Sequence, residues 1–107
     1  MYTLKETAIY SKMVNALFTQ DEQEQLHIFI AQNHDNGDVI PHSGGCRKIR
    51  YARTGMGKRG GVRVIYYNQL DDGVINLLLV YAKAKTQNIP SHILKQITKE
   101  LNKGVQP

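Results

Sequence analysis

Apolar residues recur at helical spacing twice in the first third of the chain, and each run predicts an amphipathic helix. The first predicted helix has Thr7 as its N-cap and runs to about Phe18. The second is capped by Thr19 or Asp21 and ends near Asn33. Acidic residues crowd the first turn of the second helix, where the helix dipole favours them.

After Asp38 the period of the pattern changes from helical to strand-like. Three strands are predicted in quick succession, at about Cys46–Ala52, Val62–Gln69 and Val74–Lys83. The segment LDDGV joins the last two as a hairpin turn, with Asp72 and Gly73 expected at positive φ. The last strand, VINLLLVYA, is almost continuously apolar, so we expect it to be central in the sheet and covered on both faces.

A closing helix is predicted to begin at Pro90 and Ser91. Its sequence, SHILKQITKELNK, places four apolar residues on one face: Ile93, Leu94, Ile97 and Leu101. With a short strand over residues 2–6, the element order is β-α-α-β-β-β-α. We therefore expect one α+β domain over residues 1–107, with an antiparallel sheet of about four strands, helices packed on one face, and the other face left for function.

Length and composition agree with one small globular domain. A chain of 107 residues with a net charge of +5 can form one hydrophobic core. The single cysteine, Cys46, excludes an internal disulfide and a multi-cysteine zinc site. No secretory signal and no apolar run of roughly 20 residues is present, so we expect a soluble cytoplasmic protein without membrane contact.

Positive charge is concentrated in one part of the sequence. All five arginines fall within residues 47–63, inside a 32-residue stretch, 39–70, that contains no aspartate or glutamate. Cations at this density repel one another unless a polyanion lies against them, and the favoured polyanion is RNA. Five of the nine acidic residues lie within 21–38, so we expect one cationic and one acidic face.

Strand alternation sorts the basic residues by face. Lys48 and Arg50 point to one face of their strand, and Ile49 and Tyr51 point to the other, which belongs to the core. Parity alone leaves the orientation of the next strand open. Burial of Arg63 among apolar residues would need a charged partner that the segment lacks, so we expect Arg63 beside Lys48 and Arg50.

The loop TGMGKRGG lies between these two strands. Its glycines permit close approach of the backbone to a ligand, and Lys58 and Arg59 would reach phosphates from the hairpin tip. It is not a Walker motif, because no Ser or Thr follows and no helix begins there. The alternative interpretation is a solvated basic hairpin. Tyr51, Tyr66 and Tyr67 offer flat surfaces on which bases could stack, although tyrosines in strands are more often residues at the edge of the core.

The segment GGCRKIRYARTGMGKRGGVRVIYY, followed by INLLLVYAKAK, resembles the RelE/HigB toxins of bacterial type II toxin-antitoxin systems. The resemblance extends over nearly the whole chain. It implies a RelE-like fold and a metal-independent, ribosome-dependent endoribonuclease that cuts mRNA in the ribosomal A site. It also implies a tightly bound antitoxin, expected to be a HigA-like helix-turn-helix protein, and a toxin that is itself monomeric.

Residues and resemblance together give two sets of candidates. Guanidinium groups present paired donors to phosphate oxygens, and a lysine among other cations loses its proton more readily, so Lys48 or Lys58 could act as a base. The candidate catalytic residues are Lys48, Arg50, Lys58, Arg63 and Lys83. The candidate RNA-binding residues are Arg47, Arg53, Arg59, Tyr67 and Tyr81. No metal or cofactor is expected.

The chain departs from the family pattern near its closing helix. Some members carry an arginine and a tyrosine there, whereas AKAKTQNIPSH contains neither. Tyr81, Lys83 or Lys85 could substitute, so the general acid and base are unassigned at this point.

Histidine and cysteine side chains are further candidates for proton transfer or metal binding. His42 is a candidate acid or base, but a solvated loop histidine is the more frequent case. His27 and His34 are spaced too widely on their helix to ligate one metal without a third strong ligand. Cys46 could have a lowered pKa beside Arg47, but a buried structural thiol is several times more frequent.

Two alternative functions remain open. A basic domain of this kind can inhibit translation by binding RNA or the ribosome without cleavage. ParE-like toxins that act on DNA gyrase share the fold, although they generally lack the K-x-R and K-R-G-G clusters of this chain.

Overall fold

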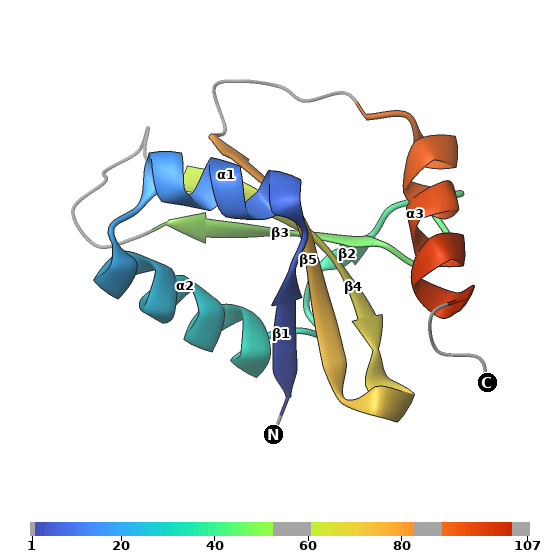
Figure 1. Cartoon of the computed structure of the whole chain (residues 1–107), viewed down its shortest axis with the longest axis horizontal. Helices are drawn as coiled ribbons and strands as arrows, with labels where there is room; N and C mark the ends of the chain where they lie inside the picture. Colours follow the sequence, from blue (N-terminus) through green and yellow to red (C-terminus); the bar gives the residue numbers. More distant parts are fainter. Residues whose placement is uncertain (1, 53–60, 83–88, 104–107) are drawn as a thin grey trace.

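The computed structural model describes residues 2–52, 61–82 and 89–103, and it has the expected α+β character. Its elements, shown in Figure 1, are β1 (Thr3–Glu6), α1 (Ala8–Leu17), α2 (Gln20–Gln32), β2 (Asp38–Val39), β3 (Arg47–Ala52), β4 (Gly61–Gln69), the 3-10 turn η2 (Leu70–Asp72), β5 (Val74–Ala82) and α3 (Ser91–Lys103).

The five strands form one mixed sheet with the order β1-β5-β4-β3-β2. The prediction of an antiparallel sheet of about four strands was wrong in two respects. The first strand pairs parallel to β5, and a two-residue strand, β2, adds an edge beside β3. The apolar strand β5 needs hydrogen-bonding partners on both sides, and β1 and β4 provide them. The prediction of a central strand is confirmed in that β5 lies inside the sheet, although β4 is its middle strand.

Both N-terminal helices begin where their capping residues predict. The Thr7 side chain accepts a hydrogen bond from the Tyr10 backbone amide at 3.0 Å. Thr19 and Glu22 form a reciprocal capping box, which decides the alternative between Thr19 and Asp21 in favour of Thr19. These caps fix the first residues of α1 and α2.

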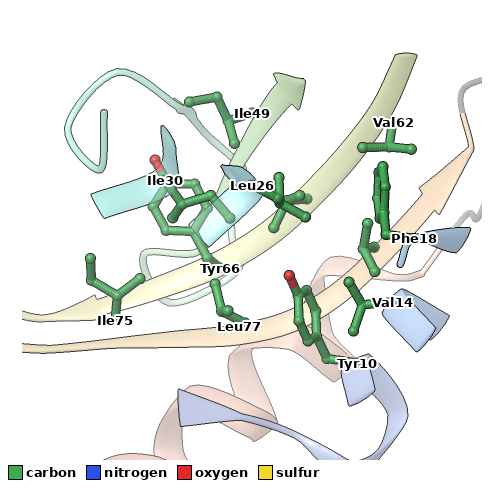
Figure 2. Close-up of a cluster of buried hydrophobic side chains, with 12 residues drawn as sticks. Tyr10, Val14, Phe18, Leu26, Ile30, Ile49, Val62, Tyr66, Ile75 and Leu77 are labelled. Atoms are coloured by element: carbon green, nitrogen blue, oxygen red, sulfur yellow. The ribbon is translucent and has the colours of Figure 1, made fainter. Parts of the chain in front are cut away.

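Helices α1 and α2 cover one face of the sheet, which we call the core face. Figure 2 shows apolar side chains of both helices meeting side chains from β3, β4 and β5. The buried cluster consists of Tyr10, Val14, Phe18, Leu26, Ile30, Ile49, Val62, Val64, Tyr66, Ile75, Leu77 and Val80. The prediction that Ile49 and Tyr51 face the core is confirmed, since Tyr51 packs against this cluster.

Helix α3 packs on the opposite face, which we call the α3 face, so the prediction of helices packed on one face holds only for α1 and α2 (Figure 1). Its buried cluster consists of Cys46, Ile65, Leu78, Leu79, Tyr81 and Leu94. A register shift opposite Ile65 and Tyr66 leaves one extra residue in β5, and both Leu78 and Leu79 therefore contribute to this cluster. The bulge enlarges the apolar area beneath α3.

Helix α3 is rotated relative to its predicted apolar face. Leu94 is 1% exposed and Thr98 is 3% exposed, whereas Ile93 is 44% exposed. Ile93 therefore does not share the buried side of the helix with Leu94, as the predicted apolar face required. The Thr98 hydroxyl donates to the Lys95 carbonyl at 2.8 Å, so this buried polar group is satisfied.

The turn between β4 and β5 agrees with its predicted position but only partly with its predicted conformation. Gly73 has φ 67° in the left-handed region, as expected. Asp72 belongs to η2 and, among the described residues, the only non-glycine residue with positive φ is His42. The three-residue 3-10 turn replaces the two-residue hairpin geometry, and the positive φ is confined to Gly73.

Candidate nucleic-acid interface on the α3 face

Strands β3 and β4 bring Arg50 and Arg63 to the same face of the sheet. Ile49 and Val64 belong to the core face. The neighbouring residues Arg50 and Arg63 therefore point to the α3 face, because side chains alternate along each strand. The prediction that Arg63 shares a face with Lys48 and Arg50 is confirmed.

The register makes Arg50 and Arg63 direct cross-strand neighbours, and we call them the arginine pair. Their Cβ atoms are separated by about 5 Å, as is usual for directly opposed residues in an antiparallel ladder. Within the described part of the chain, no acidic side chain forms an ion pair with either arginine. The result is two arginine side chains at directly opposed positions, without an acidic partner among the described residues.

Tyr81 and Lys48 flank the arginine pair. Tyr81 lies on β5 directly opposite Arg63, and it is 7% exposed. Lys48 lies two residues before Arg50 on β3, about 7 Å along the strand, with Ile65 opposite it on β4. Four of the predicted site residues are thus brought together on three adjacent strands: Lys48, Arg50, Arg63 and Tyr81.

Arg47 is not part of this group. It shares the parity of Ile49, and its Nη1 donates to the Asp35 carbonyl at 3.1 Å and to the Gly37 carbonyl at 2.8 Å. These bonds tie the turn after α2 to the start of β3. The guanidinium therefore satisfies backbone acceptors on the other side of the sheet from the arginine pair.

Tyr67 faces the same side as Arg63 but lies four residues further along β4, about 13 Å away. Its hydroxyl accepts a hydrogen bond from the Asn102 amide at 3.1 Å, and its ring packs beside Gly45. A Cβ at Gly45 would approach the Tyr67 ring to 3.3 Å. Tyr67 thus packs under α3, away from the arginine pair.

Four further candidates lie outside the described residues: Arg53, Lys58, Arg59 and Lys83. The phosphate-reaching role of the TGMGKRGG tip, and the role of Lys83 or Lys85 after β5, remain predictions from the sequence.

Cys46 is a buried residue of the hydrophobic core. Cys46 is 0% exposed within the cluster beneath α3. Burial raises the pKa of the Cys46 thiol to about 11, against a smaller lowering effect of its hydrogen bond with Ser43. The alternative of a lowered pKa was therefore wrong.

The histidines lie away from the arginine pair. His27 Nε2 is 3.2 Å from the Tyr10 hydroxyl and 3.9 Å from the Glu6 carboxylate, and burial lowers the pKa of His27 against the opposing effect of Glu6. His34 Nδ1 is 3.0 Å from the Ala31 carbonyl. In the described ranges, no three His, Cys, Asp or Glu side chains are grouped as metal ligands would be.

His42 is exposed in the turn that precedes β3, with φ 61°. Arg50 lies in the second half of β3, so the strand separates the two residues. The fold does not bring His42 to the arginine pair.

The sequence analysis missed one residue beside Lys48. Asp38, in β2, is the direct cross-strand partner of Lys48 on the side away from β4. A two-residue strand is too short to show any alternation, so the pairing has no signal in the hydrophobic pattern.

In the ranges that the structure covers, no helix is both long enough and apolar enough to cross a bilayer. A scan of the sequence against protein-family models finds no match.

Proposed function

We propose that this protein is the toxin of a type II toxin-antitoxin pair, and that it cleaves mRNA on the ribosome. The proposal joins the resemblance of the basic segment to the RelE/HigB toxins with the arrangement of Lys48, Arg50, Arg63 and Tyr81 on one face. A small helix-turn-helix protein encoded by a neighbouring gene is the proposed antitoxin.

The observation that carries the proposal is the arginine pair. Like charges directly opposite each other in a ladder are destabilising, by an amount of the order of 0.5 kcal/mol. Among the described residues no acid offsets this repulsion. A bound phosphodiester would offset it, because two guanidinium groups can together donate to several phosphate oxygens and stay charged.

The chemistry requires three actions on the RNA. The 2′-hydroxyl loses its proton and attacks the adjacent phosphorus, the phosphorane charge is stabilised, and the departing 5′-oxygen gains a proton. Arg50 and Arg63 are proposed to stabilise the phosphorane. Tyr81, which is 7% exposed in the cluster beneath α3, is proposed to support the Arg63 side chain from the neighbouring strand.

A second candidate is a translation inhibitor that binds RNA or the ribosome without cutting. It is favoured by the absence of histidine from β3, β4 and β5, since histidine is the most frequent proton-transfer residue in such reactions. The arginine pair would then supply affinity alone.

A purified translation system separates the candidates. We expect the wild-type protein to cut mRNA within codons at the A site, with products that end in 2′,3′-cyclic phosphate. The antitoxin candidate should suppress this cutting. Arrested ribosomes with intact mRNA would support the non-cleaving inhibitor, and inhibition of gyrase supercoiling would support a ParE-like toxin; either result would refute the proposal.

A further inference from the structure

Asp38 and Lys48 form a cross-strand pair at the edge of the candidate interface. The short strand β2 pairs antiparallel to β3, with Asp38 opposite Lys48. Directly opposed residues in an antiparallel pair project from the same face, with Cβ atoms about 5 Å apart. The Asp38 carboxylate therefore lies on the α3 face, the face that carries Arg50 and Arg63.

The Asp38 carboxylate is open to solvent. Asp38 is exposed, and within the described ranges its carboxylate makes no hydrogen bond or ion pair. Lys48 is partly buried and likewise makes no ion pair there. Asp38 and Lys48 thus lie opposite each other without forming an ion pair, so each side chain can contact a bound RNA.

The spacing suits a phosphodiester. Lys48 lies two residues before Arg50, so the Asp38–Lys48 pair and the arginine pair are adjacent rows about 7 Å apart on one face. A phosphate held by Arg50 and Arg63 would place its attached ribose within reach of the next row. Proton-transfer groups belong at that position.

We propose that Asp38 is the general base and Lys48 the general acid of the reaction, an inference that rests on the proposed ribonuclease function. The Asp38 carboxylate takes the proton of the 2′-hydroxyl, and the 2′-oxygen forms a bond to phosphorus. The bond from phosphorus to the 5′-oxygen breaks, and that oxygen takes a proton from the Lys48 ammonium group. The products are a 2′,3′-cyclic phosphate and a 5′-hydroxyl.

The positions of Asp38 and Lys48 also allow their starting protonation states to be restored after each turnover. After one turnover Asp38 holds an extra proton and Lys48 lacks one. Because the two side chains project from directly opposed positions, the proton can pass from the carboxylic acid to the amine without an external carrier. No metal or cofactor is needed for the balance.

The test compares Asp38→Asn with Asp35→Asn in single-turnover cleavage of mRNA on programmed ribosomes. Asp35 is an exposed acid in the neighbouring turn and has no partner position on β3, so it controls for the loss of one negative charge. We expect Asp38→Asn to slow cleavage by about 100-fold or more, because general bases contribute on that scale. Asp35→Asn should cut like the wild type.

A pH profile distinguishes a catalytic role from a structural one. The wild-type rate should fall on acidification, and this fall should be absent in Asp38→Asn. Asp38→Glu, which keeps the carboxylate, should retain the fall and part of the rate. Binding of an uncleavable 2′-deoxy mRNA should be as tight or tighter in Asp38→Asn, since one negative charge is gone.

Three outcomes would overturn the inference. If Asp38 only offsets part of the positive charge of Lys48, the Asp38→Asn variant will cleave mRNA as fast as the wild type or faster. If Asp38 only stabilises β2, the rate will follow the folded fraction measured by thermal unfolding, and the acidic fall will persist. A wild-type protein that leaves mRNA intact would refute the ribonuclease function itself, and this inference with it.

Discussion

Arg47 and Arg50 lie three positions apart on one strand, yet their surroundings differ in kind. The Arg47 guanidinium bonds to two backbone carbonyls, those of Asp35 and Gly37. Arg50 faces another arginine, Arg63. The first arrangement stabilises the fold, and the second reduces stability in the absence of a ligand.

These surroundings predict opposite effects on stability. Arg47→Ala should lower the free energy of unfolding by about 2 kcal/mol, since hydrogen bonds to a charged group contribute on that scale. The thermal midpoint should then fall by about 8 °C. Arg63→Gln relieves the repulsion, so its midpoint should stay unchanged or rise by up to about 2 °C.

Calorimetry of the two variants without RNA is the measurement. A midpoint for Arg63→Gln that falls as far as that for Arg47→Ala would mean that Arg63 has a stabilising partner, and the argument for a phosphate ligand would lose its main support.

At the scale of elements, α3 determines how much of its face remains open. It covers the end of the face that contains Cys46 and Ile65, whereas Arg50 and Arg63 lie further along their strands. Leu94 anchors this contact at 1% exposure, and its neighbour Ile93 is 44% exposed.

The two neighbours should therefore respond differently to truncation. Leu94→Ala should cost about 2–5 kcal/mol of unfolding free energy, because it leaves a cavity beneath α3. Ile93→Ala should change it by about 0.5 kcal/mol or less, as for other surface positions. Urea denaturation measures both.

Thiol labelling provides a local control for this prediction. Cys46 is the only cysteine and lies in the same cluster as Leu94. A thiol reagent should modify it faster in Leu94→Ala than in Ile93→Ala. Equal labelling rates would contradict the role of Leu94 as the anchor of α3.

The elements differ in how far the sequence determines them. Alternation gave Arg50 and Lys48 a common face, and the cost of burying Arg63 without a charged partner put Arg63 on that face as well. It could not show that they are direct neighbours, since that depends on the register of β3 against β4. The parallel pairing of β1, the two-residue strand β2 and the rotation of α3 all depend on tertiary contacts that leave no local pattern.

The bulge in β5 is a clear example of this limit. The run VINLLLVYA reads as one continuous apolar strand, and nothing in it marks Leu78 as an extra residue. The bulge is visible only against the partner residues Ile65 and Tyr66. Likewise, the position of Asp38 opposite Lys48 depends on the pairing of β2 with β3, which has no signal in the sequence.

At the scale of the whole molecule, the sheet separates stability from function. Its core face is covered by α1 and α2, and among the described residues its other face is covered by α3 around Cys46 and Ile65, whereas Arg50 is exposed. The cations that the sequence concentrates within residues 47–63 are divided between these faces. Arg47 serves the fold, and Lys48, Arg50 and Arg63 are proposed to serve RNA.

The most direct test of this division is single-turnover cleavage of ribosome-bound mRNA by Arg63→Ala and Arg47→Ala, at a temperature where both are folded. We predict that Arg63→Ala slows cleavage by about 100-fold or more, since loss of one donor to a developing negative charge costs that much. Arg47→Ala should cut at nearly the wild-type rate. Equal losses in the two variants, or full activity in Arg63→Ala, would contradict the assignment of the arginine pair as the phosphate site.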